Sequence, residues 1–219
     1  MEGTKSIKKN LIQVVMNANQ IKETVILNII KMLCTRDLIK EKHMDLYKTT
    51  AFNQIDQNDE TFFNVDTDES EKIDSKSVNI KFINRKITTI RKVIDIETFM
   101  DKPGYKFVIV NNIAPKAVKQ ITEYKQTELF YEYELLINLI DHILVPKHYK
   151  LNENEKQLFM NDYQISTDDL KNLKRMYIDD PITRYYNLSI GDIMRVERPS
   201  LTSGICVDYR IVVNGSINK

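Results

Sequence analysis

The amino-acid sequence predicts a mixed α+β and α/β chain in two parts: helices on a small mixed sheet, followed by a compact α+β domain. Two observations predict this class. A helical pattern between two strand patterns within residues 77–110 is typical of a parallel crossover unit. Beyond residue 125 the pattern changes to alternating strands and short helices. We therefore predict an N-terminal domain at 1–125 and a C-terminal domain at 126–219.

A helix over residues 21–39 is predicted near the start of the N-terminal domain. Apolar residues from Ile21 to Leu33 recur at three- and four-residue spacing, so one helical face is suited to packing on a sheet. Residues 56–74 then carry eight acidic side chains and one lysine without periodicity. This composition indicates a solvated acidic loop, and a functional acidic segment is the alternative.

The predicted crossover unit begins with a strand at 77–84, where apolar and polar residues alternate. Helical spacing of apolar residues predicts a helix within 88–102, and Pro103 and Gly104 end it. The short apolar run at 105–110 suits a buried strand. This order of elements favours parallel pairing of the two strands.

The C-terminal domain is predicted from a different set of patterns. Apolar residues occupy every odd position of 129–139, which predicts a strand with one solvated face, and the alternation at 205–213 predicts a closing strand. A capping-box pattern at 152–155 predicts a helix start, and a second helical turn is predicted within 167–177. The Asp-Pro pair at 180–181 predicts another helix. Aspartate can cap its first amides, and proline suits the first helical position because the backbone N–H that it lacks would have no partner within the helix.

The composition excludes several classes of protein. The chain has 32 basic and 31 acidic side chains and a net charge of +1, so no global field favours nucleic acid or an anionic membrane. Cys34 and Cys206 are the only cysteines, which excludes a disulfide framework and a cysteine-based zinc site. No apolar window is long enough to span a membrane, and the first residues lack a secretory pattern. We expect a soluble, non-secreted chain without a membrane partner.

The residues of common catalytic sites are not brought together in the sequence. His43, His142 and His148 do not form a helical zinc-protease motif, and the five glycines do not form a phosphate-binding loop. His142 and His148 stay open as a metal pair, with structural histidines as the favoured alternative. A metal-dependent nuclease needs clustered carboxylates and a lysine at a strand end, and the strand at 105–110 has no carboxylate. Two tripeptides with an acid and a lysine at this spacing occur in the chain, but both lie outside apolar strands, so neither supplies the lysine of such a site.

Two basic segments are candidates for contact with phosphate groups. The segment 81–92 has five basic side chains and no acid, although a solvated strand-helix junction explains it as well. These five are Lys81, Arg85, Lys86, Arg91 and Lys92. In the turn at 111–120, Pro115 leads into a predicted helix that carries Lys116 and Lys119, and its early amides suit a phosphate. The alternative for this turn is a plain connection between strand and helix.

Four ordered motifs connect the C-terminal domain to a known family: "ELLINLIDHILVPKH" at 134–148, "DDPITRYY" at 179–186, "GDIMRVERPS" at 191–200 and "SGICVDYRIV" at 203–212. They resemble the assembly domain that the fifth-largest common subunit of the nuclear RNA polymerases shares with its archaeal counterpart. The resemblance implies a docking surface, for which arginine and tyrosine are well suited. The implied interface residues are His142, Pro146, His148, Pro181, Arg184, Tyr185, Arg198, Pro199, Ser200, Gly204, Tyr209 and Arg210.

The N-terminal domain resembles the jaw domain of eukaryotic members through "TTIRKVIDIETFMDK" and "YKFVIVNNIAPKAVKQI". That jaw has the fold of a truncated nuclease without its active site. In the family, the turn after the buried strand faces downstream DNA, and Pro115, Lys116 and Ala117 hold the matching positions here. The family's threonine-proline-serine-alanine run is changed, because Ala114 precedes the proline and Lys116 follows it. With Lys119, the proline and the lysine are the expected DNA-binding residues.

The resemblance implies a non-catalytic subunit of a multisubunit DNA-directed RNA polymerase, without a cofactor or metal. Its assembly domain is expected to dock on the largest subunit, in one copy per complex and beside other subunits. Its jaw domain is expected to contact downstream double-stranded DNA without sequence specificity. The expected location is the nucleus for a cellular protein, and the host cytoplasm or the virion for a large DNA virus. Two alternatives from other classes are a metal-dependent nuclease and a free-standing scaffold that uses the assembly domain.

Overall fold

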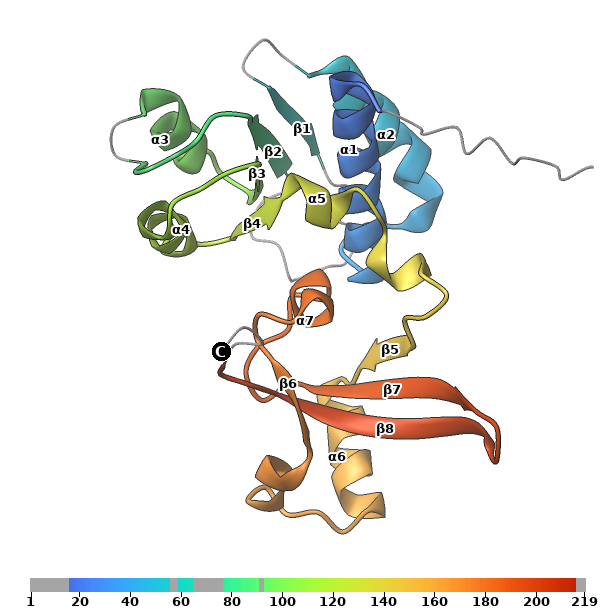
Figure 1. The fold of residues 1–219 in the computed structure, drawn as a ribbon. Helices are drawn as coiled ribbons and strands as arrows, with labels where there is room; N and C mark the ends of the chain where they lie inside the picture. Colours follow the sequence, from blue (N-terminus) through green and yellow to red (C-terminus); the bar gives the residue numbers. More distant parts are fainter. Residues whose placement is uncertain (1–15, 56–58, 65–76, 91–92, 216–219) are drawn as a thin grey trace, which may run out of the picture.

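The computed structural model describes residues 16–55, 59–64, 77–90 and 93–215. Two four-stranded sheets, each flanked by helices, form an N-terminal unit and a C-terminal unit. The N-terminal unit lies in the upper half of Figure 1 and the C-terminal unit in the lower half, with helix α7 (Pro181–Tyr185) between them. Each sheet combines parallel and antiparallel pairs, which confirms the predicted mixed α/β class.

The N-terminal sheet is built from β1 (Glu60–Asn64), β2 (Ser77–Ile83), β3 (Tyr105–Val110) and β4 (Thr127–Tyr131), in that order. Strands β2, β3 and β4 pair in parallel, and β1 is antiparallel to β2. Two helices, α3 (Ile94–Met100) and α4 (Pro115–Thr122), connect the parallel strands. The predicted crossover unit is therefore confirmed, and it is repeated once.

Helices cover both faces of this sheet. On one face lie α1 (Ala18–Thr35) and, after a 3₁₀ turn at Glu41–His43, α2 (Met44–Asn53); α3 and α4 lie on the other (Figure 1). All six residues of β3 are buried, as expected for a parallel strand covered on both faces. The predicted N-terminal helix is confirmed as α1, which starts where the Asn17 side chain accepts the Gln20 amide at 2.8 Å. No helix in the described ranges has the length and apolar character needed to cross a membrane.

The acidic loop predicted at 56–74 contains a strand. Residues 60–64 form β1, and the alternate residues Thr61 and Phe63 are buried against the N-terminal core. The loop prediction is wrong for this stretch, because the many acidic neighbours concealed a short period-2 pattern. Apart from Asp59, the other residues of the predicted loop lie outside the described residues.

The strand predicted at 129–139 ends early. Strand β4 stops at Tyr131, and the next residues form the short helix α5 (Glu132–Leu135). The Tyr131 amide donates to the Glu134 carboxylate at 2.9 Å, which favours a helix start and ends the extended conformation. Because β4 belongs to the N-terminal sheet and Leu135 to its core, the N-terminal unit extends past residue 125.

The C-terminal sheet is built from β5 (Lys147–Lys150), β7 (Ile193–Ser200), β8 (Gly204–Val213) and β6 (Lys174–Tyr177), in that order. Strand β8 confirms the predicted closing strand. One face of the sheet packs against α6 (Glu153–Asp162), and the other packs toward α7 and the 3₁₀ turn at Leu139–Asp141. The C-terminal unit therefore has a small core on each side of its sheet.

Side-chain caps start the two helices of this unit where the sequence predicted them. The Glu155 amide donates to the Asn152 side chain at 2.9 Å, and the Ile182 amide donates to Asp180 at 2.8 Å. The helical turn predicted at 167–177 is only partly correct. A 3₁₀ turn at Asp169–Asn172 gives way to β6, because the following residues pair with β8.

Candidate functional site

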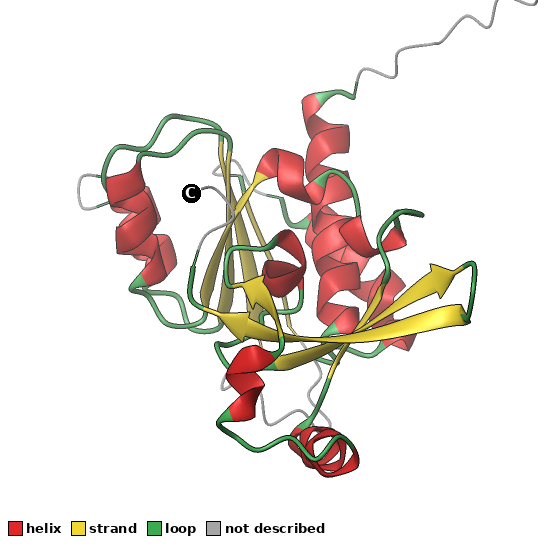
Figure 2. Cartoon of the chain, turned by 60° about the horizontal axis from the view of Figure 1, so that its bottom comes forward, coloured by secondary structure: helices red, strands yellow, loops and turns green. Residues whose placement is uncertain are grey.

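The long β7–β8 hairpin extends beyond the rest of its sheet, as Figure 2 shows. Its base is covered on one face by α6, where the rings of Tyr209 and Phe159 lie 4.2 Å apart. Its outer half carries apolar side chains at the surface. Pro199 and Ile205 face each other across the two strands, and Leu201 is fully exposed in the turn that joins them.

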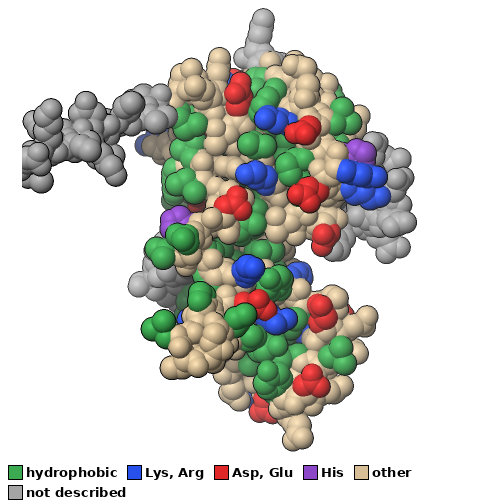
Figure 3. All heavy atoms as spheres, turned by 90° about the vertical axis from the view of Figure 1, so that its right-hand side faces the viewer, with side chains coloured by type: hydrophobic (Ala, Val, Ile, Leu, Met, Phe, Trp, Pro, Cys, Tyr) green, Lys and Arg blue, Asp and Glu red, His purple; other side chains and the backbone are tan. Residues whose placement is uncertain are grey.

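A second group of exposed apolar side chains lies in the loop that precedes β5. Ile143 and Leu144 are both strongly exposed there. This loop and the hairpin turn both lie on the right of Figure 1, the side that faces the viewer in Figure 3, and hydrophobic side chains gather there over the C-terminal unit. Several large apolar groups exposed on one side are typical of an interaction site. We define the hairpin surface as Ile143, Leu144, Pro199, Leu201 and Ile205.

The carboxylates of β7 and β8 beside the hairpin surface are paired with basic side chains of the sheet. Asp208 of β8 accepts hydrogen bonds from Arg198 of β7 and from Lys174 of β6, the latter at 2.7 Å. Arg195 lies 2.6 Å from Glu197. A partner protein could therefore cover the apolar residues without removing an unpaired carboxylate from water.

The two histidines predicted as an alternative metal pair contact the backbone of their own loop. His148 Nδ1 lies 2.7 Å from the carbonyl oxygen of Pro146, and His142 Nδ1 accepts the Leu144 amide at 3.2 Å. Burial lowers the pKa of His148 below its ordinary value; the Pro146 carbonyl opposes this shift, and the positive charge of Arg210 adds to it. Within the described ranges, no group of three or more histidine, cysteine or acidic side chains is arranged to hold a metal ion.

The structure divides the predicted interface residues into separate places. Those on or beside the hairpin surface are His142, Pro146, His148, Arg198, Pro199, Ser200 and Gly204. Tyr209 and Arg210 lie at the base of the hairpin, and Pro181 is exposed at the start of α7. Arg184 and Tyr185 point inward instead. Arg184 donates to Glu134 and to the Leu129 carbonyl, both at 2.6 Å, and Tyr185 is buried in the N-terminal core.

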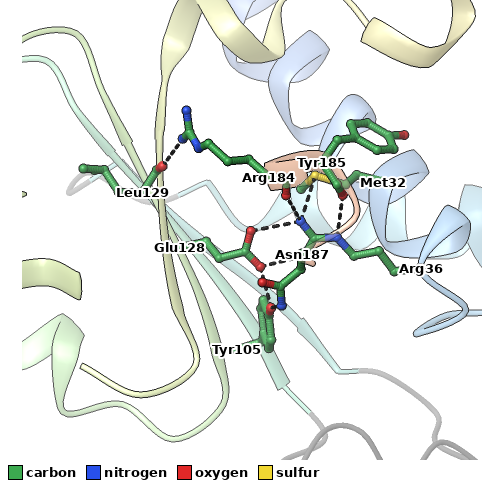
Figure 4. Close-up of polar contacts among 8 residues, drawn as sticks. All are labelled: Met32, Arg36, Tyr105, Glu128, Leu129, Arg184, Tyr185 and Asn187. Atoms are coloured by element: carbon green, nitrogen blue, oxygen red, sulfur yellow. Dashed lines mark hydrogen bonds and ion pairs between the residues drawn. The ribbon is translucent and has the colours of Figure 1, made fainter. Parts of the chain in front are cut away.

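Arg184 and Tyr185 belong to a polar cluster that joins the two units, drawn in Figure 4. At its centre is Arg36, which follows α1 and is almost completely buried. Its guanidinium donates to both carboxylate oxygens of Glu128, at 2.6 and 2.9 Å. It also donates to the main-chain carbonyls of Tyr185 and Arg184, at 2.7 and 2.9 Å. Burial alone would lower the pKa of Arg36, but the Glu128 carboxylate, with Tyr105 and Tyr185, opposes this effect and the pKa is raised.

Tyr105 and Asn187 complete the cluster. The Tyr105 hydroxyl donates to Glu128, and the Asn187 side-chain amide donates to that hydroxyl at 2.8 Å. Burial and the adjacent Glu128 carboxylate raise the pKa of Tyr105, so the hydroxyl keeps its proton as a donor. Sequence reasoning identified only two members of this set. We define the Arg36 cluster as Arg36, Tyr105, Glu128, Arg184, Tyr185 and Asn187.

The predicted DNA-binding residues lie together on one exposed turn. Pro115 is the first residue of α4, and Lys116 and Lys119 are exposed on the same helix. The Ala114 amide donates to the Ile87 carbonyl at 2.9 Å, which ties this turn to the segment that precedes α3. Neither lysine ammonium has an ion-pair partner among the residues that the structure describes. Both charges are therefore available to an anionic ligand.

The other basic segment, 81–92, does not form a comparable surface. Lys81 is buried and pairs with Glu60, and Arg85 lies 3.3 Å from Asp95. The last two residues of the segment lie outside the described residues. Because carboxylates neutralise two of its five basic side chains, this segment offers less free positive charge than its sequence indicated.

The chain is built from two joined α/β units, and its hairpin surface has the exposed apolar character typical of an interaction site. The model of the family described as "RNA polymerase Rpb5, C-terminal domain" matches residues 137–212. The DNA-directed RNA polymerase subunit 5 of Acanthamoeba polyphaga mimivirus is 32% identical over 218 residues, which cover 97% of this chain and 100% of that protein. This chain belongs to the family of the fifth subunit of DNA-directed RNA polymerases.

Cellular relatives match a smaller part of their length. The rpabc1 subunit of RNA polymerases I, II and III from Dictyostelium discoideum is 37% identical over 134 residues, which are 58% of this chain and 66% of that protein. Subunit 5B of RNA polymerases IV and V from Arabidopsis thaliana is 32% identical over 143 residues, which are 63% of this chain and 64% of that protein. The predicted family, and its place among the non-catalytic subunits of the polymerase, are thereby confirmed.

Proposed function

We propose that this chain is a subunit of a DNA-directed RNA polymerase that docks on the largest subunit through its C-terminal unit and holds its N-terminal unit beside downstream DNA. The observation that carries this proposal is the similarity to mimivirus subunit 5 from end to end, which gives both units a counterpart in a protein named as a polymerase subunit. One copy would be present per complex. It would act in the nucleus of a cell, or in the host cytoplasm or virion of a large DNA virus.

The hairpin surface supports docking of the C-terminal unit. Its apolar side chains face water, while Asp208 and the basic side chains beside it are already paired. Contact with an apolar surface of a partner would remove apolar area from water, at about 25 cal/mol per Å², with little loss of polar hydration. The interface residues predicted at Pro199, Ser200 and Gly204 lie on this hairpin.

The first turn of α4 supports contact with DNA. Lys116 and Lys119 are exposed and lack carboxylate partners in the described structure. Lysines of this kind contact phosphates, since they lack the bidentate fork that reads base edges, so binding would be independent of sequence. With a net charge of +1, the isolated chain would bind DNA weakly, and the polymerase cleft would supply the remaining positive field.

Replacing Lys116 and Lys119 together by glutamate is expected to leave incorporation into the polymerase unchanged, because both lysines lie on the unit that does not dock. The open complex is expected to dissociate faster, and the salt dependence of its lifetime to fall by at most about two phosphate contacts. The measurement is the open-complex lifetime over a salt series, with reconstituted enzymes. As a matched control, Lys42→Glu with Lys171→Glu makes the same change in charge at exposed positions outside α4. Curves for the α4 variant that superimpose on wild type would remove this turn from the DNA path.

A further inference from the structure

The Arg36 cluster joins segments that are far apart in the sequence: the end of α1, the strands β3 and β4, and the end of α7 (Figure 4). Arg36 belongs to the N-terminal unit, yet it donates to the carbonyls of Arg184 and Tyr185 in the last turn of α7. Carbonyls in the last turn of a helix lack amide partners four residues on. The Arg184 carbonyl also accepts the Asn187 amide at 3.1 Å, so the guanidinium adds its bonds to those of the helix end, and a residue of the other unit helps to orient that end.

Helix α7 is held by both units. Ile182 lies in the C-terminal core, and Tyr185 lies in the N-terminal core three residues later. The side chain of Arg184 reaches back to Glu134 and to the Leu129 carbonyl, at 2.6 Å each. Contacts therefore run in both directions across the junction. Because α7 is held by contacts with both units, it restricts how one unit can rotate relative to the other.

Because the polar groups of this junction are buried, they favour one relative orientation of the two units. The side chains of Arg36 and Glu128 are 4% and 16% exposed, so water cannot readily replace a lost partner. The planar guanidinium matches one carboxylate and two carbonyls at the same time, and a flexible ammonium does not reproduce that fork. Rotation of one unit against the other would break several hydrogen bonds to buried groups together. The described contacts thus favour one relative orientation.

We propose that the Arg36 cluster positions α4 relative to the hairpin surface. Glu128 is in β4, the strand that follows α4, so α4 and the cluster share the N-terminal sheet. This inference rests on the proposed function. When the hairpin surface docks on the polymerase, the fixed orientation of the units then determines the position of Lys116 and Lys119 beside the DNA. The N-terminal unit needs no binding surface of its own on the polymerase. Arg36 and Asn187 act as positioning residues, because neither is on the exposed turn that would face DNA.

The orientation of the units is measured in the isolated full-length chain, independently of any polymerase. Spin labels are placed on the exposed native Cys206 and on Glu123→Cys, at the end of α4, and pulsed electron paramagnetic resonance gives the distance between them. Cys34 is replaced by serine in every chain that is compared, because it is only partly buried and would otherwise also take up label. The wild-type chain is expected to give one narrow distance distribution.

Two variants of the cluster are compared with one control. Arg36→Lys keeps a cation beside Glu128 but loses the fork, and we expect the distance distribution to broaden. Asn187→Gly removes the amide that binds Tyr105 while allowing the positive φ of 48° at this position, and we expect a smaller broadening. Arg85→Met removes an exposed ion pair with Asp95, at 3.3 Å, that lies within the N-terminal unit, and we expect the wild-type width.

The same variants are then assembled into polymerase. Arg36→Lys and Asn187→Gly are expected to be incorporated as well as wild type, yet to shorten the open-complex lifetime toward that of the Lys116→Glu, Lys119→Glu protein. Wild-type widths in both cluster variants would overturn the proposal, and so would a broadened distribution with a wild-type lifetime. If the wild-type chain itself is not incorporated, the polymerase role fails and the positioning of DNA contacts fails with it. The distance distributions would still show separately whether the cluster holds the two units together.

Discussion

Replacing Arg36 by methionine is expected to lower the free energy of unfolding by about 3 to 5 kcal/mol, because the Glu128 carboxylate stays buried without its cation. Of the donors to Glu128 shown in Figure 4, only the Tyr105 hydroxyl is left. For a chain of this length, the loss corresponds to a fall of roughly 6 to 20 °C in Tm. Urea unfolding followed by circular dichroism measures the change. Methionine retains much of the side-chain volume, so the charge and its hydrogen bonds dominate the effect.

Two further variants isolate the contribution of the cluster to stability. Lys31→Met also removes a cation of α1, but its ion pair with Asp141 is exposed, and the expected loss is below about 1 kcal/mol. Combining Arg36→Met with Glu128→Met removes both charges and is expected to recover part of the stability. An Arg36→Met protein within about 0.5 kcal/mol of wild type, the range of ordinary surface changes, would contradict this account of the junction.

Leu201→Asp combined with Ile205→Asp is expected to weaken incorporation into the polymerase by about 2 to 4 kcal/mol. This is roughly a 30- to 1,000-fold loss of affinity, because two charges would have to enter an apolar contact. Both side chains are exposed in the free chain, so the fold should be retained. Competition between labelled wild-type and variant chains for a limiting amount of polymerase core measures the loss, and a melting curve checks the fold.

The matched control for the hairpin variant is Leu158→Asp on α6. Leu158 is 61% exposed and Ile205 is 64% exposed, so the two positions differ in location rather than in exposure. The control is expected to be incorporated like wild type. Equal competition by the hairpin variant and the control would show that the partner contacts another surface of the chain.

The elements that periodicity predicted correctly are those in which local chemistry and tertiary environment agree. The run at 105–110 is apolar except for Lys106, and β3 is buried on both faces. The caps at Asn152 and Asp180 depend on side chains within three residues, so they form wherever the chain starts a helix there. The alternation at 205–213 continues as β8, because one face of its base is covered by α6.

Two elements were predicted wrongly, for different physical reasons. Strand β1 has only Thr61 and Phe63 as buried residues, and its pairing with β2 outweighs the acidic composition around it. The strand predicted at 129–139 was too long, since the Glu134 side chain caps a helix that starts after Tyr131. In the first case a distant pairing overrides the local composition, and in the second a cap three residues away competes with the period-2 alternation.

Sequence reasoning named Arg184 and Tyr185 of the Arg36 cluster, but not the residues that they contact. Arg184 and Tyr185 have the chemistry of interface residues, and they form an interface between two parts of one chain. Their partners are remote: Arg36 is separated from Glu128 by 92 residues and from Tyr185 by 149. The exposure of Leu201 likewise depends on how far the hairpin projects beyond α6, which no local pattern specifies.

The most direct test of the polymerase assignment is affinity purification of the tagged chain from its source, followed by mass spectrometric identification and quantification of the chains that stay bound at high salt. We expect the largest subunit of a DNA-directed RNA polymerase and its other subunits, with one copy of this chain per complex. Recovery of the chain without polymerase subunits, or with an unrelated set of proteins, would contradict the account and favour a free-standing scaffold.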